Sequence, residues 1–95
     1  MKIVINTCFG GFGLSALACE MLSELTGHKV SRYDYCEEDE RTAPELVAVV
    51  ETLGGVKASD TYAALKVVEV PDDVKWYIDD YDGVETVEEV HRSWS

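Results

Sequence analysis

Apolar residues recur at helical spacing in two parts of the chain. In the first part they fall at positions i, i+3, i+4, i+7, i+8 and i+11, which makes one apolar stripe on an amphipathic helix. Ser15 is placed to cap the first turn through its hydroxyl, and Gly27 to end the helix, because glycine takes the left-handed conformation without a Cβ clash. The stripe consists of Leu14, Leu17, Ala18, Met21, Leu22 and Leu25.

A second helix is predicted to open in residues 42–45 (Thr-Ala-Pro-Glu), which have the spacing of a capping box. Proline is allowed in the first turn of a helix. Gly54 and Gly55 are expected to end this helix. Its expected buried positions are Leu46, Val47, Val50 and Leu53.

Two strands are expected in the N-terminal half. Residues 2–6 form a short apolar run that ends in a glycine cluster, which predicts a buried strand. Residues 29–35 are expected to form a second strand. It would lie parallel to the first, joined to it through the helix by a right-handed crossover.

The last third of the chain changes character. Residues 62–70 and 76–79 are rich in strand formers, and Asp82-Gly83 is a strong turn signal. Residues 84–90 can return as a strand. The positions Val84, Val87, His91 and Trp94 also fit a helical spacing, so the last element is either a strand or a helix.

Together these elements predict one α+β domain over residues 1–95, in the order β-α-β-α-β-β-β. We expect a small mixed sheet with two helices on one face and an antiparallel C-terminal meander. A chain of 95 residues buries only roughly 60–65% of its unfolded surface, so its stability margin is thin. A homo-oligomer that buries more apolar surface is therefore expected.

Charge narrows the function classes. Nineteen acidic residues face eight basic ones, and the net charge is −11. Such a field repels phosphate backbones and anionic lipid, so we expect neither nucleic-acid polymer nor membrane binding. The acids cluster at residues 37–40, 72–73, 79–82 and 88–89. They either keep the protein soluble, or imitate DNA, or dock on a basic partner.

Cysteine usage indicates a reducing compartment. The spacing of Cys8, Cys19 and Cys36 matches no zinc or redox motif. The opening apolar run is too short for a signal peptide, and no stretch approaches the roughly 20 apolar residues that span a bilayer. We therefore expect three reduced thiols, no metal, no cofactor and a cytoplasmic location.

The strongest local signal is the glycine-rich loop from Asn6 to Ser15. Its three glycines permit positive φ and leave the backbone uncovered. The N–H groups at the start of the helix could converge on an anion, where the helix dipole adds roughly half a positive charge. Phe9 and Phe12 could stack on a base or pack in an oligomer interface. The loop predicts either a phosphate site or a tight, closely packed turn.

Arginines are scarce in this acidic chain, and two of them are candidate ligand contacts. Arg41 and Arg92 could form bidentate hydrogen bonds with a phosphate or a carboxylate, and Trp94 could stack on a ring. Alternatively, the arginines pair with acids of the same chain. The full set of expected ligand contacts is Asn6, Cys8, Phe9, Gly10, Gly11, Phe12, Gly13, Ser15, Arg41, Arg92 and Trp94.

Catalysis has weaker signals. Cys8 could be a nucleophile, but the only histidines, His28 and His91, lie far away in sequence. The carboxylates of residues 79, 80 and 82 could bind Mg²⁺ or Ca²⁺, or serve as acid and base, although their spacing is not that of an EF-hand loop. A solvated hairpin with charged edges is the preferred explanation. No catalytic or metal-binding residue is therefore predicted.

Both ends of the chain resemble a family of short proteins encoded mostly by bacteriophages. At the N-terminus the resemblance lies in Asn6-x-Cys8-Phe9-Gly10-Gly11-Phe12-Gly13-Leu14-Ser15. At the C-terminus it lies in residues 68–74 (Val-Glu-Val-Pro-Asp-Asp-Val), 76–78 (Trp-Tyr-Ile), 81–83 (Tyr-Asp-Gly) and His91-Arg92-x-Trp94. The resemblance implies a phage protein in bacterial cytoplasm, where small phage proteins often counter host defence.

The leading hypothesis is a non-enzymatic, homo-oligomeric protein that binds or sequesters a small phosphate-bearing, nucleotide-derived ligand through the glycine-rich loop. One alternative is an acidic protein that inhibits a host enzyme by protein–protein contact or by DNA mimicry. The other is a small hydrolase that uses Cys8 or the carboxylates of Asp79, Asp80 and Asp82.

Overall fold

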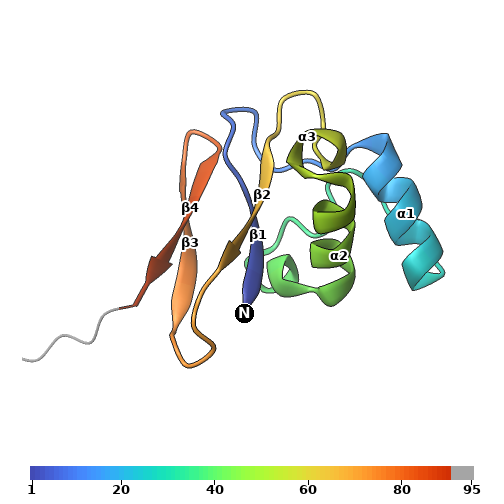
Figure 1. The fold of residues 1–95 in the computed structure, drawn as a ribbon. Coiled ribbons are helices and arrows are strands. Elements are labelled where there is room, and N and C mark those ends of the chain that lie inside the picture. The colour runs from blue at the N-terminus through green and yellow to red at the C-terminus, as the bar shows by residue number, and fades with distance from the viewer. Residues whose placement is uncertain (91–95) are drawn as a thin grey trace, which may run out of the picture.

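The apolar run after Met1 forms a buried strand in a computed structural model, which describes residues 1–90 (Figure 1). The elements are β1 (Lys2–Asn6), α1 (Ala16–Thr26), the 3-10 helix η1 (Glu38–Thr42), α2 (Pro44–Leu53), α3 (Gly55–Ala58), β2 (Leu65–Glu69), β3 (Trp76–Tyr81) and β4 (Val84–Glu89). The predicted α+β class is confirmed.

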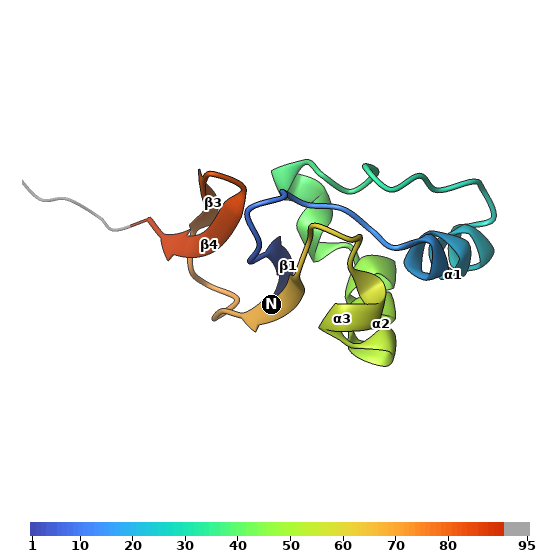
Figure 2. The same cartoon turned by 90° about the horizontal axis from the view of Figure 1, so that it is seen from above.

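The strands form two small antiparallel sheets. In the first, β1 pairs with β2, with Ile3 opposite Val68. In the second, β3 and β4 form a hairpin that lies on one side of β1, while α1, α2 and α3 lie on the other side (Figures 1 and 2). The hairpin turns at Asp82 and Gly83, whose φ angles are 52° and 87°. Positive φ at both positions defines the turn expected from an Asp-Gly pair.

The ends of α1 agree with the sequence prediction. The Ser15 hydroxyl accepts a hydrogen bond from the Ala18 N–H at 3.1 Å, and Gly27 takes the left-handed conformation with φ 76°. The α2 helix also begins at Pro44 and ends before Gly54, as expected.

The predicted capping box at residues 42–45 is wrong. Ala43 occupies the N-cap position of α2, and it has no side-chain acceptor. Thr42 instead ends η1, because Glu37 and Glu40 form a capping box one segment earlier and extend a helical turn into this region.

The core lies between α1, α2 and the β1–β2 pair. Val4, Leu14, Leu22 and Leu46 are among the largest side chains in it that are fully buried. The predicted stripe on α1 is only partly buried, since Leu17 and Leu25 are exposed by 46% and 61%. The buried hydrophobic residues are Ile3, Val4, Ile5, Phe12, Leu14, Ala18, Leu22, Val30, Leu46, Val47, Val49, Val50, Ala58 and Leu65.

Residues 29–35 do not form the expected parallel strand. They run beside the glycine-rich loop (Figure 2), where the Leu14 N–H donates to the Arg32 carbonyl at 3.0 Å. A local turn replaces the strand: the Ser31 N–H donates to the Asp34 carboxylate at 2.9 Å, and Tyr35 has a φ of 69°. Side chains that bond nearby backbone compete with a strand ladder. The sheets are consequently antiparallel rather than mixed.

The expected C-terminal meander is also wrong in its pairing. β2 pairs with β1 and not with β3, which lies in the second sheet with β4. The last element is a strand over Val84–Glu89, which settles the choice between strand and helix. The short helix α3 has no counterpart in the sequence prediction. Within residues 1–90, no helix has the length and apolar character needed to cross a membrane.

Candidate functional site

Three loops meet at one end of the domain, at the top of Figure 1: residues 7–13, 59–64 and 82–83. We call these residues the loop end. A Cβ added to Gly10 would lie 1.9 Å from the Tyr62 carbonyl oxygen, and one added to Gly83 would lie 2.5 Å from the Phe9 carbonyl oxygen. The glycine-rich loop is therefore packed between the other two loops, and its glycines permit that close approach.

Asn6 joins the three loops from inside. Its side chain is fully buried, and its amide nitrogen donates to the carbonyls of Cys8 at 2.7 Å and Gly83 at 2.6 Å. Its amide oxygen accepts from the N–H groups of Ala64 at 2.9 Å and Cys8 at 3.3 Å. An asparagine amide has two donor hydrogens and two acceptor lone pairs, so its capacity is filled.

Arg41 lies inside the domain and not at an open binding site. Its exposure is 3%, and it forms a bidentate pair with Glu85, with N–O distances of 2.6 and 2.7 Å. The other donors reach the carbonyls of Val4, Tyr35 and Cys36. All five N–H groups of the guanidinium are thus used, which leaves none for a phosphate.

The Arg41–Glu85 pair substitutes for a neighbouring strand on the second edge of β1. The Thr7 N–H and the Met1 carbonyl bond to the β2 side, so the alternate residues of β1 face the opposite edge. On that edge the Val4 carbonyl accepts from Arg41, and the Asn6 N–H donates to Glu85. The ion pair therefore anchors the β3–β4 hairpin to β1.

Phe12, predicted to stack on a ligand base, packs instead on Arg41. The guanidinium carbon lies 3.9 Å from the centre of the Phe12 ring, and Phe12 is 8% exposed. This geometry is a cation–π contact. Phe9, by contrast, is 75% exposed. The segment that contains Arg92 and Trp94, with His91, lies outside the described residues.

Some of the N–H groups around the start of α1 have partners within the chain, whereas those of Phe12, Gly13 and Ala16 have none within residues 1–90. The Gly11 N–H donates to Cys8, the Ser15 N–H to Ala58, and the Ala18 N–H to the Ser15 hydroxyl. The Ser15 hydroxyl itself donates to the backbone carbonyl of Lys57. Gly11 has a φ of 84°. Gly13 packs against Asp60, since a Cβ added to Gly13 would lie 3.1 Å from the Asp60 Cβ. The loop is a closely packed turn, and the phosphate ligand stays a prediction.

The three cysteines are free thiols. Burial raises the pKa of Cys19 and of Cys36 above the ordinary cysteine value, which lowers their thiolate fraction near neutral pH. Among the described residues, the Cys8 thiol makes no hydrogen bond to a histidine. Nor do three or more His, Cys, Asp or Glu side chains gather within residues 1–90 in a way that could hold a metal ion. One carboxylate oxygen of Asp80 accepts the Gly83 N–H at 2.9 Å within the hairpin turn.

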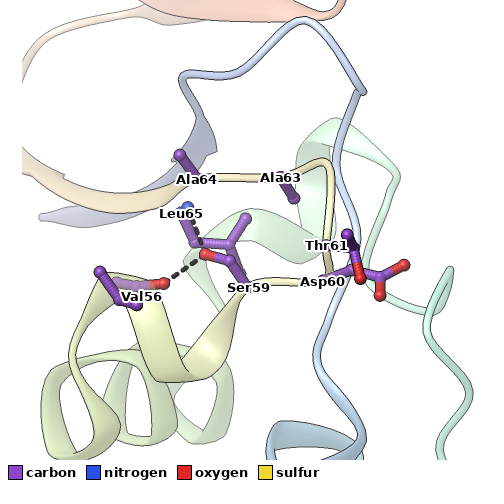
Figure 3. Close-up of a pocket in the computed structure, with 8 residues that line it drawn as sticks. Val56, Ser59, Asp60, Thr61, Ala63, Ala64 and Leu65 are labelled. Carbon is purple, nitrogen blue, oxygen red and sulfur yellow. Dashed lines mark hydrogen bonds between the residues drawn. The ribbon is translucent and has the colours of Figure 1, made fainter.

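A cavity of about 380 Å³ lies beside the loop end, between α3 and the start of β2 (Figure 3). The hydroxyl of Ser59 bonds to the backbone there: it donates to the Gly55 carbonyl and accepts from the Leu65 N–H. Asp60 contributes the one charge of the lining, and it pairs with Arg32 at 3.3 Å. The lining has no lysine or arginine and therefore does not suit a phosphate: Gly55, Val56, Ser59, Asp60, Thr61, Ala63, Ala64 and Leu65.

The sequence prediction missed the residues that expose aromatic surface at this end. Tyr62 is 75% exposed and Tyr81, next to the hairpin turn, is 77% exposed. With Phe9 they make three aromatic side chains around the packed glycines. The prediction also missed Glu85, although an acid among the inward positions of a strand that also holds Val87 is an unusual pattern that could have indicated a buried partner.

Substitutions of single glycines distinguish the stability cost of a steric clash from the cost of a strained backbone conformation. We expect Gly10→Ala to cost about 3 kcal/mol, because its Cβ would collide with the Tyr62 backbone. Gly11→Ala should cost only about 1–2 kcal/mol, since it meets no atom within 4 Å and bears only the strain of positive φ. Urea unfolding measures both.

Gly27→Ala is the matched control, because Gly27 also has positive φ and open space around it. It should resemble Gly11→Ala in stability. Calorimetry with a panel of nucleotides then tests the phosphate prediction, which requires that the wild type binds and that Gly11→Ala, but not Gly27→Ala, weakens binding. Equal losses of stability for Gly10→Ala and Gly11→Ala would contradict the packing argument.

Comparisons of the chain with models of protein families, with curated proteins and with solved structures found no match.

Proposed function

We propose that this protein binds another protein through its loop end and presents an acidic, aromatic surface to a basic partner. The observation that carries the proposal is the exposure of Phe9, Tyr62 and Tyr81, each by three quarters or more, around the closely packed glycine-rich loop. Large exposed aromatic side chains are frequent anchors of protein interfaces.

Charge at the loop end supports a basic partner. Asp82 lies in one of its loops and Asp80 lies beside the turn, while Asp60 already pairs with Arg32. Neither lysine nor arginine occurs in residues 7–13, 59–64 or 80–83. A phosphate would meet repulsion at this end. A lysine or arginine from a partner would pair with the carboxylates and stack on the rings.

Protein contact is favoured over DNA mimicry by the same surface. A duplex presents regularly spaced phosphates along its length, whereas here exposed rings lie among the carboxylates, as Tyr81 does between Asp80 and Asp82. The resemblance to phage-encoded proteins implies a bacterial host protein as the partner, and inhibition of a host enzyme as the outcome. A homo-oligomer stays a prediction of the sequence.

Affinity purification with chemical cross-linking from a bacterial lysate tests the proposal. The wild type is compared with Phe9→Ala and Tyr62→Ala, and alanine at position 62 keeps the Cβ that lies against Gly10. Tyr33→Ala is the control, because Tyr33 is 65% exposed and lies outside the loop end. A captured protein is then purified and titrated directly.

We expect Phe9→Ala and Tyr62→Ala each to weaken binding of that purified protein by about tenfold or more, and Tyr33→Ala to leave it unchanged. A captured protein whose affinity is the same for all four forms would refute a loop-end interface. Failure to capture any protein, together with nucleotide binding in calorimetry, would favour the phosphate ligand instead.

A further inference from the structure

We propose that the free edge of β3 pairs with an extended, basic segment of the partner, which adds to the hairpin as a third strand. This inference rests on the proposed function and names how the partner binds. Main-chain hydrogen bonds would supply affinity, and alternate side chains would supply specificity.

The free edge follows from the hairpin register. Tyr81 pairs with Val84 across the two-residue turn, and the Val90 N–H donates to the Lys75 carbonyl at 2.8 Å. The odd-numbered residues of β3 therefore bond to β4. The N–H and carbonyl groups of Trp76, Ile78 and Asp80 point away from β4, and within residues 1–90 no backbone group bonds to them.

The side chains beside this edge suit a strand of alternating basic and apolar residues. Tyr77, Asp79 and Tyr81 are all exposed, and they share the open face of the hairpin because side chains alternate along a strand. A lysine on that face would meet a carboxylate between two rings. On the opposite face, Trp76 and Ile78 are half-buried and offer apolar contact to the intervening residues.

Charge distinguishes a basic partner from a second copy of this chain. Each copy carries a net charge of −11, so two hairpins brought edge to edge repel each other. Acidic residues on an edge strand are one way in which proteins prevent self-pairing. The same carboxylates at Asp79 and Asp80 attract a basic strand.

The outer edge of β2 has fewer free backbone N–H and carbonyl groups than the edge of β3. The Leu65 N–H donates to the Ser59 hydroxyl at 2.7 Å, and a Cβ on Gly55 would lie 2.4 Å from the Leu65 carbonyl oxygen, so α3 covers the start of this edge. Only Val67 and Glu69 of β2 face outward beyond it. The β2 edge therefore serves as an internal control.

The test uses a nine-residue peptide of alternating lysine and valine, with a peptide of alternating glutamate and valine as control. Amide hydrogen exchange is followed by NMR in the whole protein. We expect the lysine peptide to slow exchange at Ile78 and Asp80 by about tenfold or more, since those N–H groups gain partners. The amides of Tyr77 and Asp79 bond to β4 already, and those of Val67 and Glu69 lie on the other edge, so all four should stay unchanged.

Two charge reversals add a matched pair. Asp79→Lys lies on the open face of β3, whereas Asp73→Lys makes the same change in charge in the turn before it; both side chains are exposed. Asp79→Lys should lower the affinity for the lysine peptide by about tenfold, and Asp73→Lys should lower it far less.

Four results would overturn the inference: no binding of the lysine peptide, binding without protection at Ile78 and Asp80, equal effects of the two reversals, or protection that rises with protein concentration in the absence of peptide. The loop-end proposal is judged separately, by Phe9→Ala and Tyr62→Ala, which leave the β3 edge intact. A captured partner that depends on those two residues but leaves the β3 edge unprotected would reject strand addition alone.

Discussion

Glu85→Gln is expected to lower the free energy of unfolding by about 3–5 kcal/mol, because it leaves the buried guanidinium of Arg41 without its counter-charge. The side chains of Arg41 and Glu85 are 3% and 7% exposed, so water cannot replace the lost partner. The amide NH₂ of the new glutamine would also face an N–H donor of Arg41. Urea unfolding measures the loss, and thermal unfolding should show a Tm lower by about 12 °C or more.

Glu51→Gln is the matched control. The Lys2–Glu51 pair has a similar N–O distance, 2.9 Å, but both side chains are nearly half exposed. An exposed pair contributes little, so the unfolding midpoint should barely move. If Glu85→Gln behaves like Glu51→Gln, then the pair does not hold the hairpin on β1. Exchange of the β3 and β4 amides gives a second readout, since a released hairpin should lose protection before the core does.

The helices could be predicted from the sequence because their signals are local. The caps at Ser15 and Gly27 and the proline at the start of α2 each act on backbone only a few residues away. The hairpin turn is local too, since Asp82 and Gly83 alone supply the two positive φ angles. Each of these predictions required only chemistry that a short window of sequence contains.

The strand pairing could not be predicted, because it depends on what occupies the second edge of β1. Pattern alone suggested a parallel strand from residues 29–35, but a turn between Ser31 and Asp34 satisfies that backbone locally. The side chains of Arg41 and Glu85, 44 residues apart in sequence, occupy the edge instead. A contact of that separation leaves no periodic signal.

In the candidate site, too, local features could be predicted and long-range contacts could not. The glycine-rich loop was recognised from composition, and its close packing was one of the two interpretations. Which interpretation holds depends on Tyr62 and Gly83, which come from loops roughly 50 and 70 residues further along the chain. Sequence indicated where the chain is unusual, but only the fold shows that Gly10 faces a backbone rather than solvent.

Asn6→Leu is expected to cost about 3 kcal/mol or more. Leucine has the same branched shape, although its methyl groups are larger than the amide atoms. It leaves the carbonyls of Cys8 and Gly83 and the N–H of Ala64 without their side-chain partner, and each buried polar group that loses its partner costs about 1–3 kcal/mol. Thr7→Val is the control: the neighbouring hydroxyl is exposed and donates one hydrogen bond to Ala64, so its loss should cost about 1 kcal/mol or less. Equal losses would show that the buried amide does not join the loops.

Asn6→Asp tests the same network through pH. The new carboxylate would be buried and would face the carbonyl oxygens of Cys8 and Gly83 with the Glu85 carboxylate close by, so its pKa in the folded state must rise. The folded state then binds a proton that the unfolded state releases above about pH 4, and the stability deficit relative to wild type grows as the pH rises from there. Urea unfolding of both proteins should give a larger deficit at pH 7 than at pH 5, because the protonated acid can still donate one of the two lost hydrogen bonds. A deficit that is the same at both pH values would place the side chain of residue 6 outside this ring of carbonyls.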